Sequence, residues 1–184
     1  MKFTRQNIND VILIEPKLYN DDRGYFSETF RLDLLQDFVG HKISFVQDSE
    51  SKSYKGVLRG LHFQSPPFMQ AKLVRVIKGN VLDVAVDIRS GSRTFGKHVS
   101  VELSAENKKQ LFVPRGFAHG FVVLSESAIF SYKVDNYYSK DHDNGVAYND
   151  KDLNIDWRLS KEELLISTKD KNQPNLNEIR DIFK

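Results

Sequence analysis

The chain has 184 residues, a length that predicts one domain covering residues 1–184 with enough side chains for a hydrophobic core. Its 27 lysines and arginines are scattered along the sequence beside 25 acidic residues, so no dedicated nucleic-acid surface is expected. The absence of cysteine excludes disulfides, thiolate nucleophiles, iron–sulfur clusters and cysteine-ligated zinc.

The mostly polar segment 1–10 lacks the apolar stretch of a secretory signal, which predicts a cytoplasmic protein. No run of aliphatic or aromatic residues exceeds four, against the roughly 20 that a membrane span needs, so no membrane partner is expected. Short strand-like segments separated by turns predict an all-β sandwich or barrel. These segments are residues 11–14, 43–47, 72–77, 81–88, 96–103, 110–113, 120–124 and 128–134.

Helical spacing of apolar residues is present in two places. One helix is expected over residues 32–39, before Gly40, and another around Leu176, Ile179 and Phe183. The segment 160–175 is rich in lysine and acidic residues, and its few apolar anchors predict a surface excursion or a lid.

The segment 81–88 alternates with the period of two that is typical of a half-buried strand. Its even positions are apolar, whereas Asp83 and Asp87 fall together on the odd face. Lys78-Gly79-Asn80 has the composition of a tight turn and predicts a hairpin between this strand and residues 72–77.

The first group of residues that could carry chemistry is Arg59-Gly60-Leu61-His62-Phe63-Gln64. In a regular extended segment His62 shares one face with Gly60 and Gln64, and Arg59 points the other way. A histidine in such a place is either a hydrogen-bonded structural residue or an acid–base group.

The second group, Pro114-Arg115-Gly116-Phe117-Ala118-His119, resembles the second signature of cupin barrels, in which the histidine points into the barrel. The companion signature normally supplies His-x-His and a downstream Glu, but the corresponding place here holds His62-Phe63-Gln64. A facial metal site needs about three ligands, so the sequence predicts a barrel interior without a metal.

The third group runs from Tyr132 to Tyr138 at the end of a predicted strand. Tyr132 shares a face with Phe130 and Val134, and a buried phenol needs a polar partner. Tyr137 and Tyr138 could form a hydrophobic lid or stack on a nucleobase.

Taken together, these segments resemble the dTDP-4-dehydrorhamnose 3,5-epimerase family from about residue 11 to residue 170. The matching strings, in family order, are Asp22-Arg23-Gly24-Tyr25-Phe26-x-Glu28, Phe45-Val46-Gln47-Asp48, Val57-Leu58-Arg59-Gly60-Leu61-His62-Phe63-Gln64, Ala71-Lys72-Leu73-Val74-Arg75, Asp83-Val84-Ala85-Val86-Asp87-Ile88-Arg89, Pro114-x-Gly116-Phe117-Ala118-His119-Gly120-Phe121, Tyr132-Lys133, Asn149-Asp150, Ile155-x-Trp157 and Lys169-Asp170.

The resemblance implies a cupin jelly roll that uses neither a metal nor another cofactor and forms a homodimer with an exchanged N-terminal strand. Its substrate would be dTDP-4-keto-6-deoxy-D-glucose and its product dTDP-4-keto-L-rhamnose, a precursor of rhamnose in a surface polysaccharide. The ketone acidifies the hydrogens on carbons 3 and 5, so a base can remove one and an acid can return a proton on the opposite face.

By resemblance, four residues carry the chemistry. His62 is the base, and Asp170 holds and stabilises its ring. Lys72 stabilises the enolate oxygen, and Tyr132 is the proton donor on the far face. Without the family match, Asp170 reads as a solvated charge and Lys72 as a surface lysine whose stem packs on the barrel.

The resemblance also assigns the substrate-binding residues. Arg23 and Arg59 would contact the diphosphate, to which a guanidinium fork is suited, and Tyr138 would stack on thymine. The other residues expected to line the site are Phe26, Glu28, Gln47, His119 and Lys169. Two positions depart from the family: Ser49 stands where relatives commonly have Asn, and Asp143 where they place Glu.

Three alternatives remain open at this point. The chain could epimerise carbon 3 alone or act on another nucleotide-linked 4-keto sugar. It could be a non-catalytic sugar-binding cupin, or a metal-dependent cupin oxygenase. Asp83 could orient His119 or Tyr132, or it could be an ordinary exterior strand residue.

Overall fold

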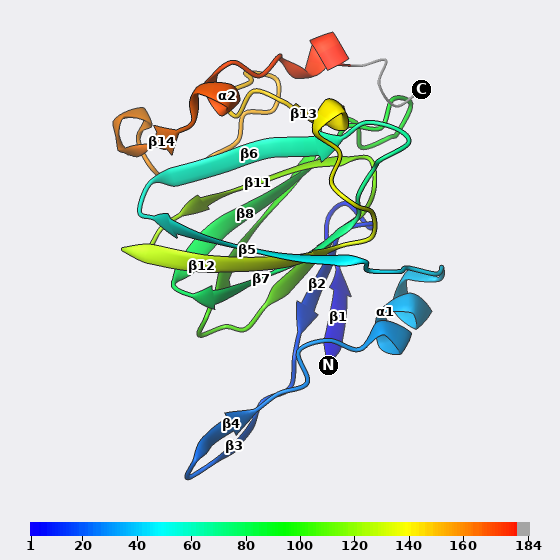
Figure 1. Cartoon of the computed structure of the whole chain (residues 1–184), viewed down its shortest axis with the longest axis vertical. Helices are drawn as coiled ribbons and strands as arrows, with labels where there is room; N and C mark the ends of the chain where they lie inside the picture. The colour runs from blue at the N-terminus through cyan, green and yellow to red at the C-terminus, as the bar shows by residue number, and fades with distance from the viewer. Residues whose placement is uncertain (180–184) are drawn as a thin grey trace.

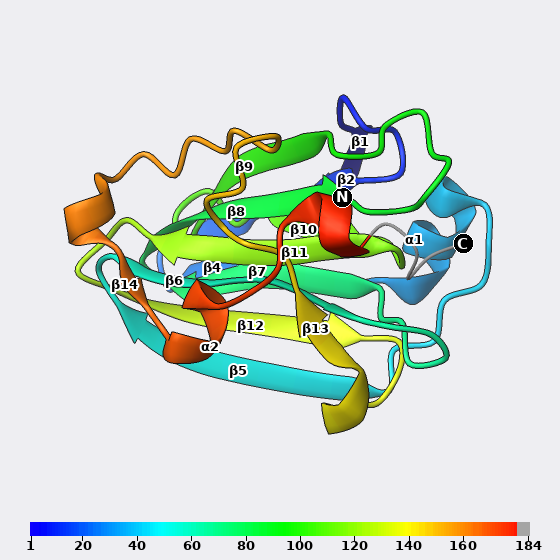
Figure 2. The ribbon, with the colours of Figure 1, turned by 90° about the horizontal axis from the view of Figure 1, so that it is seen from above.

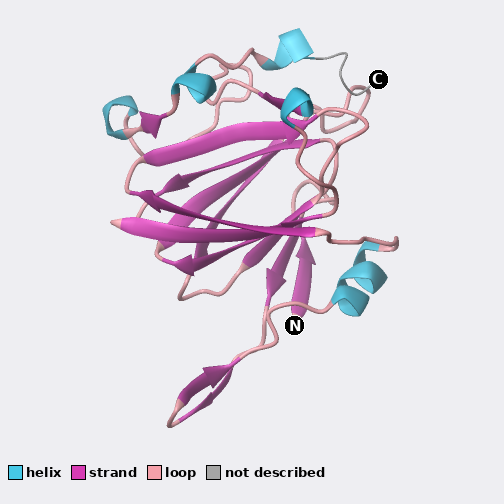
Figure 3. Ribbon diagram, in the orientation of Figure 1, coloured by secondary structure: helices cyan, strands magenta, loops and turns pink. Residues whose placement is uncertain are grey.

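The computed structural model describes residues 1–179, and within them the chain forms two six-stranded sheets and a separate two-stranded hairpin. The two sheets face each other as a sandwich, and Figure 3 shows helices only at its periphery. This architecture confirms the all-β prediction. The first sheet contains, in spatial order, β1 (Lys2–Arg5), β2 (Ile12–Glu15), β10 (Gln110–Val113), β7 (Lys72–Lys78), β12 (Ser127–Val134) and β5 (Gln47–Tyr54) (Figure 1).

The second sheet lies above the first in Figure 1. Its main strands are antiparallel and follow the order β13 (Asp143–Gly145), β6 (Val57–Gln64), β11 (Phe117–Val123), β8 (Asn80–Asp87) and β9 (His98–Ser104). One further strand, β14 (Leu165–Ile166), pairs parallel with the start of β6. The C-terminal part of the chain is thereby attached to the strand that carries His62.

Two short α-helices and three 3-10 turns complete the described residues. Helix α1 (Leu32–Val39) confirms the first helix prediction; it buries Leu35 and ends at Gly40, whose φ of 82° is left-handed. Helix α2 (Thr168–Lys171) is a single turn. Where the second helix was predicted, Leu176 and Ile179 lie in a 3-10 turn, and Phe183 lies outside the described residues. The 3-10 turns span Lys140–His142, Lys161–Glu163 and Leu176–Ile179.

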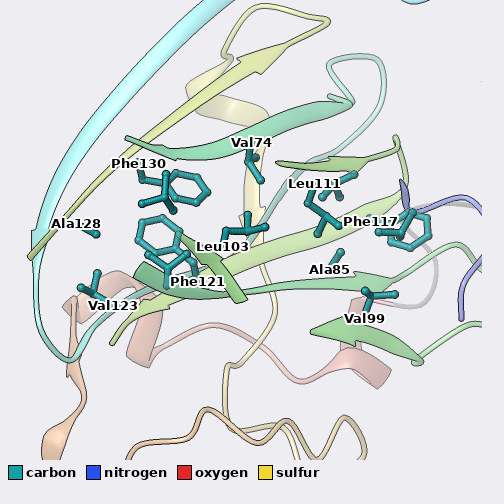
Figure 4. Close-up of a cluster of buried hydrophobic side chains, with 14 of the residues drawn as sticks. Val74, Ala85, Val99, Leu103, Leu111, Phe117, Phe121, Val123, Ala128 and Phe130 are labelled. Atoms are coloured by element: carbon teal, nitrogen blue, oxygen red, sulfur yellow. The ribbon is translucent and has the colours of Figure 1, made fainter. Parts of the chain in front are cut away.

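The space between the sheets is filled by a hydrophobic cluster whose side chains come from both sheets, as Figure 4 shows. The rings of Phe121 on β11 and Phe130 on β12 stack with centroids 4.1 Å apart. Stacked aromatic pairs of this kind add to the free energy of burial, and here they join the two sheets directly.

Strand β8 corrects the prediction of a half-buried strand. Asp83 and Asp87, expected on a polar face, are fully buried. The odd positions of β8, such as Ala85, face the cluster between the sheets, and the even positions pack under the C-terminal segment with residues such as Trp157. The apolar alternation was therefore read correctly, but the face that carries the aspartates points into the sandwich.

The turn Lys78-Gly79-Asn80 does not form the predicted hairpin. It carries the chain from β7 in the first sheet to β8 in the second. Gly79 has φ of 76°, and a Cβ there would lie 2.1 Å from the Ser127 carbonyl oxygen, so glycine is required. A tight hairpin and a crossing between sheets use the same turn residues, which is why the sequence did not separate them.

The strand predicted at residues 43–47 is also wrong for most of its length. Ile43 packs beside Leu35 of α1 in a satellite cluster, and the strand begins at Gln47. Strand β5 continues to Tyr54 through a run of polar residues. Both of its faces look hydrophilic in the sequence, so alternation of apolar residues could not reveal it.

Two segments extend beyond the sandwich. The hairpin of β3 (Tyr19–Asp21) and β4 (Gly24–Phe26) projects from the body at the bottom of Figure 1. The C-terminal segment, drawn from yellow to red, crosses the outer face of the second sheet (Figure 2). Among residues 1–179, no helix combines the length and apolar character needed to cross a lipid bilayer.

Candidate active site

A cavity of about 180 Å³ opens between the sheets beyond the stacked phenylalanines. Its walls come from β5, β7 and β12 of the first sheet and from β6 and β11 of the second. The lining residues are Ser51, Arg59, His62, Lys72, His119, Phe121, Phe130 and Tyr132. Five of the residues singled out from the sequence therefore meet in one place.

A bulge in β6 brings Arg59 and His62 to the same cavity, although regular alternation predicted opposite faces. His62 lies opposite His119 of β11, whereas Arg59 lies opposite Phe121, so β6 uses one residue more than its partner. The extra residue is Gly60, whose φ is 135° and whose Cβ would lie 2.6 Å from the Cα of Gly120. Two glycines are thus needed for this close approach of the strands.

His62 is paired with Asp170, as the resemblance implied. The His62 Nε2 and the Asp170 Oδ1 are 2.7 Å apart, and the Asp170 side chain is 5% exposed. The Asp170 Oδ2 also accepts from the Gly60 N–H at 3.4 Å. With Nε2 donating its proton to Asp170, the His62 Nδ1 is left as the basic nitrogen.

The local fold of residues 165–171 explains how Asp170 reaches this position. Strand β14 fixes the segment along β6, and the Ser167 Oγ caps helix α2 by accepting from the Asp170 N–H at 3.1 Å. Most side chains of residues 160–175 are exposed, as expected for a surface excursion, but Asp170 turns inward and is buried. The apolar content of this segment is low because most of its side chains face solvent, while Asp170 alone among residues 160–175 is buried.

The charge state of Asp170 follows from its surroundings. Burial acts to raise the pKa of this carboxyl, but hydrogen bonds from His62, Gly60 and Ser167 outweigh burial and hold the pKa below its usual range. Asp170 is consequently ionised at neutral pH, and its negative charge stabilises a positive imidazole ring on His62.

Lys72 faces the cavity from the start of β7. Burial lowers its pKa to about 8, against the opposing influence of the Asp83 and Asp143 charges. The ammonium ion is therefore still the main form at neutral pH, but it is poised to lose its proton just above. A cation buried between the two sheets interacts more strongly with a negative oxygen placed nearby than it would in water.

Asp83, fully buried on β8, holds the ring of His119. The His119 Nε2 lies 3.0 Å from both carboxylate oxygens, which fixes the ring with its other nitrogen available to the cavity. Of the two functions considered for Asp83, orientation of His119 is the one that the geometry supports, and an exterior position is excluded.

Tyr132 lies on the first sheet, across the cavity from His62 on the second. Its ring packs 6.3 Å from that of Phe130, on the shared face that the alternation predicted. A phenol on one wall and an imidazole on the opposite wall can exchange protons with two faces of a molecule held between them.

A second group of predicted residues forms a polar network at the rim. The Tyr138 hydroxyl donates to the Asp143 Oδ2 at 2.9 Å, and the Lys169 Nζ donates to the same oxygen. The Gln47 Oε1 accepts from the Tyr138 N–H at 3.4 Å, and the Gln47 Nε2 donates to the Ser49 Oγ at 3.1 Å. Lys169 directly precedes Asp170, so this rim is continuous with the cavity.

Three predicted binding residues lie outside both the cavity and the polar rim of their own chain. Arg23 and Phe26 lie on the projecting hairpin, where the Arg23 side chain is 89% exposed and Phe26 is 67% exposed. Arg23 pairs with Asp21 of the same hairpin at 2.6 Å. Glu28 lies beyond the hairpin and pairs with Arg31 at 3.6 Å.

The polar wall formed by β5 was not among the predicted parts of the site. Ser51 lines the cavity, and the buried Ser53 accepts a hydrogen bond from the Arg59 Nε at 3.0 Å. With Gln47 and Ser49, these residues recur at every second position. That alternation of small polar residues was the available signal, because a strand facing a hydrophilic cavity repeats polar side chains as a core strand repeats apolar ones.

The fold and cavity define a cupin-like jelly-roll protein whose cavity gathers His62, Lys72 and Tyr132, with Asp170 hydrogen-bonded to His62. The family model described as dTDP-4-dehydrorhamnose 3,5-epimerase matches residues 5–178. The chain belongs to this family.

Individual relatives agree over nearly the full length. The dTDP-4-dehydrorhamnose 3,5-epimerase of Shigella flexneri is 53% identical over 172 residues, 94% of each chain. The crystal structure of that enzyme from Elizabethkingia anophelis NUHP1 has a TM-score of 0.94 at 50% identity, covering 97% of both chains. A Legionella pneumophila dTDP-6-deoxy-D-glucose-3,5-epimerase, in complex with dTDP-4-keto-L-rhamnose, has a TM-score of 0.93 at 48% identity, covering 97% of this chain and 94% of that one.

Proposed function

We propose that this chain is an isomerase that converts dTDP-4-keto-6-deoxy-D-glucose to dTDP-4-keto-L-rhamnose by epimerisation at carbons 3 and 5. The observation that carries the proposal is the placement of the His62–Asp170 pair and Tyr132 on opposite walls of one cavity. Inversion of a carbon requires a base on one face and an acid on the other, and the cavity offers both.

The proton transfers balance without a redox partner. The His62 Nδ1 removes the proton from the carbon beside the ketone, and the C–H electron pair forms a carbon–carbon double bond while the carbonyl oxygen becomes an oxyanion. The Tyr132 hydroxyl then donates its proton to the opposite face of that carbon, and the carbonyl re-forms. Water returns a proton to the tyrosine and accepts one from His62, and the sequence repeats at the second carbon.

Lys72 serves in this scheme as the cation for the oxyanion. Its ammonium group faces the same cavity, and its lowered pKa of about 8 leaves it charged at neutral pH. His119, held by Asp83, supplies a second polar group that can bind a sugar oxygen. Preorganised groups of this kind stabilise charge that develops only in the transition state.

The size of the cavity indicates how the substrate lies. About 180 Å³ is less than the roughly 300–1,000 Å³ typical of a site that encloses a whole ligand, so the hexose alone fits inside. The diphosphate then leaves past Arg59, and the nucleobase lies at the rim on the exposed ring of Tyr138. Asp143, Lys169, Gln47 and Ser49 border this exit and complete the proposed binding residues.

We also propose a homodimer in which the N-terminal region of one subunit completes the site of the other. In this structure β1 pairs with β2 of its own chain, and the segment that leaves the body is the β3–β4 hairpin. Phe26 on this hairpin is a large apolar side chain left exposed, and the family resemblance places both Phe26 and Arg23 at the substrate. Their insertion into a partner's site reconciles these observations.

Solvent exchange tests the proposed reaction. The protein is incubated in deuterated water with dTDP-4-keto-6-deoxy-D-glucose, and each carbon is followed by proton NMR. Deuterium at carbons 3 and 5 supports double epimerisation. Deuterium at carbon 3 alone would show that the enzyme epimerises only that carbon.

Because a nucleotide-activated sugar is the substrate, we place the reaction in the cytoplasm.

Two substitutions exclude the other classes. The His62→Asn chain should fold but lose exchange at both carbons, whereas a non-catalytic sugar-binding protein would show no exchange to lose. The Tyr132→Phe enzyme should still exchange the sugar's protons with solvent, but few protons should be added on the opposite face, so little epimer should form. A stoichiometric transition metal that is required for turnover would contradict the scheme, because none of its steps uses one.

A further inference from the structure

Gln64 is a buried polar residue that the proposed chemistry leaves unused. It ends strand β6, two residues beyond His62, and is 5% exposed. Its Nε2 donates to the carbonyl oxygens of Phe68 at 2.9 Å and Tyr137 at 3.3 Å. Its Oε1 accepts from the Ser139 N–H at 2.6 Å. A single amide thus joins the end of β6 to two separate loops.

The residue between the two bonded positions of the second loop is Tyr138. Its ring is 55% exposed, so packing against the core does not hold it. Its hydroxyl is fixed instead by Asp143, and Asp143 lies directly opposite Gln64 in the β13–β6 pairing. The backbone on both sides of Tyr138 is therefore tied to Gln64, and the tip of the ring is tied to the neighbouring strand.

We propose that Gln64 is a positioning residue that holds Tyr138 ready as a flat platform for the planar base of the substrate nucleotide. The inference rests on the proposed function, in which the nucleobase lies on Tyr138. An exposed aromatic ring that must be ordered during binding costs affinity, and a ring already fixed by hydrogen bonds avoids that cost. Gln64 acts through the loop and does not touch the reacting sugar.

The position of Gln64 also sets a distance. His62 and Gln64 are two residues apart on one strand, which separates them by roughly 6.5 Å along β6. The base that removes the proton and the anchor of the nucleotide platform are therefore carried by the same rigid element. Sugar and nucleobase are held in a fixed relation, which favours substrates with a diphosphate linker of the right length.

Two variants separate this function from general stability. Gln64→Leu removes all three hydrogen bonds, and Gln64→Glu keeps the acceptor for Ser139 but places a carboxylate against two carbonyl oxygens. Both should raise KM for the nucleotide sugar roughly tenfold, equal to about 1.4 kcal/mol, with kcat within about twofold of the unmodified enzyme. Gln36→Leu is the control, because that glutamine also binds a backbone N–H, of Ile43 at 3.2 Å, but lies on α1.

A double-mutant cycle with Tyr138→Leu tests whether Gln64 acts through that ring. If it does, adding Gln64→Leu to Tyr138→Leu changes KM by less than about twofold. If the KM increase of the double variant equals the product of the two single-variant increases, the proposal is overturned. A fall in kcat with KM unchanged in Gln64→Leu would overturn it as well. If the Gln64→Leu protein does not fold, the same double-mutant cycle is measured with Gln64→Glu in its place.

Binding of dTDP alone and amide hydrogen exchange distinguish failure of this inference from failure of the proposed function. An enzyme that binds dTDP but exchanges no deuterium into the sugar refutes only the reaction, and the cycle is then measured on the Kd for dTDP. The Ser139 amide should exchange faster in Gln64→Leu than in Gln64→Glu. Equal exchange rates, or no binding of dTDP by the unmodified protein, would refute the function of Gln64.

Discussion

Asp170→Asn tests the central pair of the site. The substitution keeps the shape of a side chain that is 5% exposed, so the packing around α2 is preserved. It removes the negative charge that lies 2.7 Å from the His62 Nε2. The imidazole can still reach the substrate, but the positive ring formed when it accepts a proton loses its partner.

The size of the effect follows from electrostatics. Opposite unit charges about 4 Å apart attract by roughly 4 kcal/mol at the effective dielectric constant of about 20 that suits protein sites. Each 1.36 kcal/mol is tenfold in rate, so proton removal should slow by about 10³-fold. The interaction exists fully only when His62 is protonated, so the loss should fall on kcat and leave KM within a few-fold.

The assay is the rate of deuterium incorporation at carbon 3, measured together with the melting temperature. Asp150→Asn is the matched control, because Asp150 is equally buried but its hydrogen bonds come from backbone N–H groups, of Asp152 at 2.8 Å, Leu153 at 3.4 Å and Leu176 at 2.6 Å. We expect Asp150→Asn to lower the melting temperature while its exchange rate stays within about threefold of the parent, since it touches no reacting group.

Two outcomes would refute this reasoning. An Asp170→Asn enzyme that exchanges deuterium at more than about a tenth of the parent rate would show that the carboxylate contributes less than one factor of ten. Equal loss of activity in the two variants would show that any buried carboxylate matters through stability alone. In either case the assignment of the His62–Asp170 pair as the base would have to be withdrawn.

Three further predictions concern charge, packing and assembly. The epimerisation rate should fall as pH rises through about 8, where Lys72 loses its proton, and the pH profile of Lys72→Arg should lack this alkaline fall. Identical pH profiles for the two enzymes would show that Lys72 does not take part in the reaction. Phe130→Ala removes a ring that stacks 4.1 Å from Phe121 and should cost about 3–5 kcal/mol in urea unfolding, whereas a cost below about 1 kcal/mol would show that the two sheets do not depend on that contact. Arg23→Ala and His62→Asn chains, each inactive alone, should recover about a quarter of full activity when they are mixed and reassembled, because half of the dimers are mixed and one of the two sites in each mixed dimer is intact. If no activity returns, the site is not completed by a partner.

Sequence patterns predicted the fold class and the inward face of β12 well. Phe130, Tyr132 and Val134 recur at every second position, and the observed strand places Phe130 and Tyr132 toward the cavity. This succeeded because β12 pairs in uninterrupted register with β5 on one side. A period of two identifies a face reliably wherever a strand is regular.

The predictions that failed depend on contacts between distant parts of the chain. The bulge at Gly60 inverts the alternation of β6, and it exists because β6 and β11 approach closely through two glycines. The polar face of β8 is buried because the C-terminal segment covers the other face and the first sheet covers this one. Asp170 looks like a solvated charge until β14 brings it to His62. Neither composition nor spacing encodes these long-range pairings.

Asp170 lies late in the chain, after the strands that form the walls of the cavity. Within residues 1–179, every strand of the sandwich precedes residue 167, so a ribosome has synthesised all of them before it adds the carboxylate that pairs with His62. A polypeptide that ended after β14 would keep every described strand but would lack that carboxylate, together with the buried side chains of Leu176 and Ile179. Loss of the residues beyond this one junction would therefore take away the partner of His62 and, with it, part of the apolar cover of the second sheet.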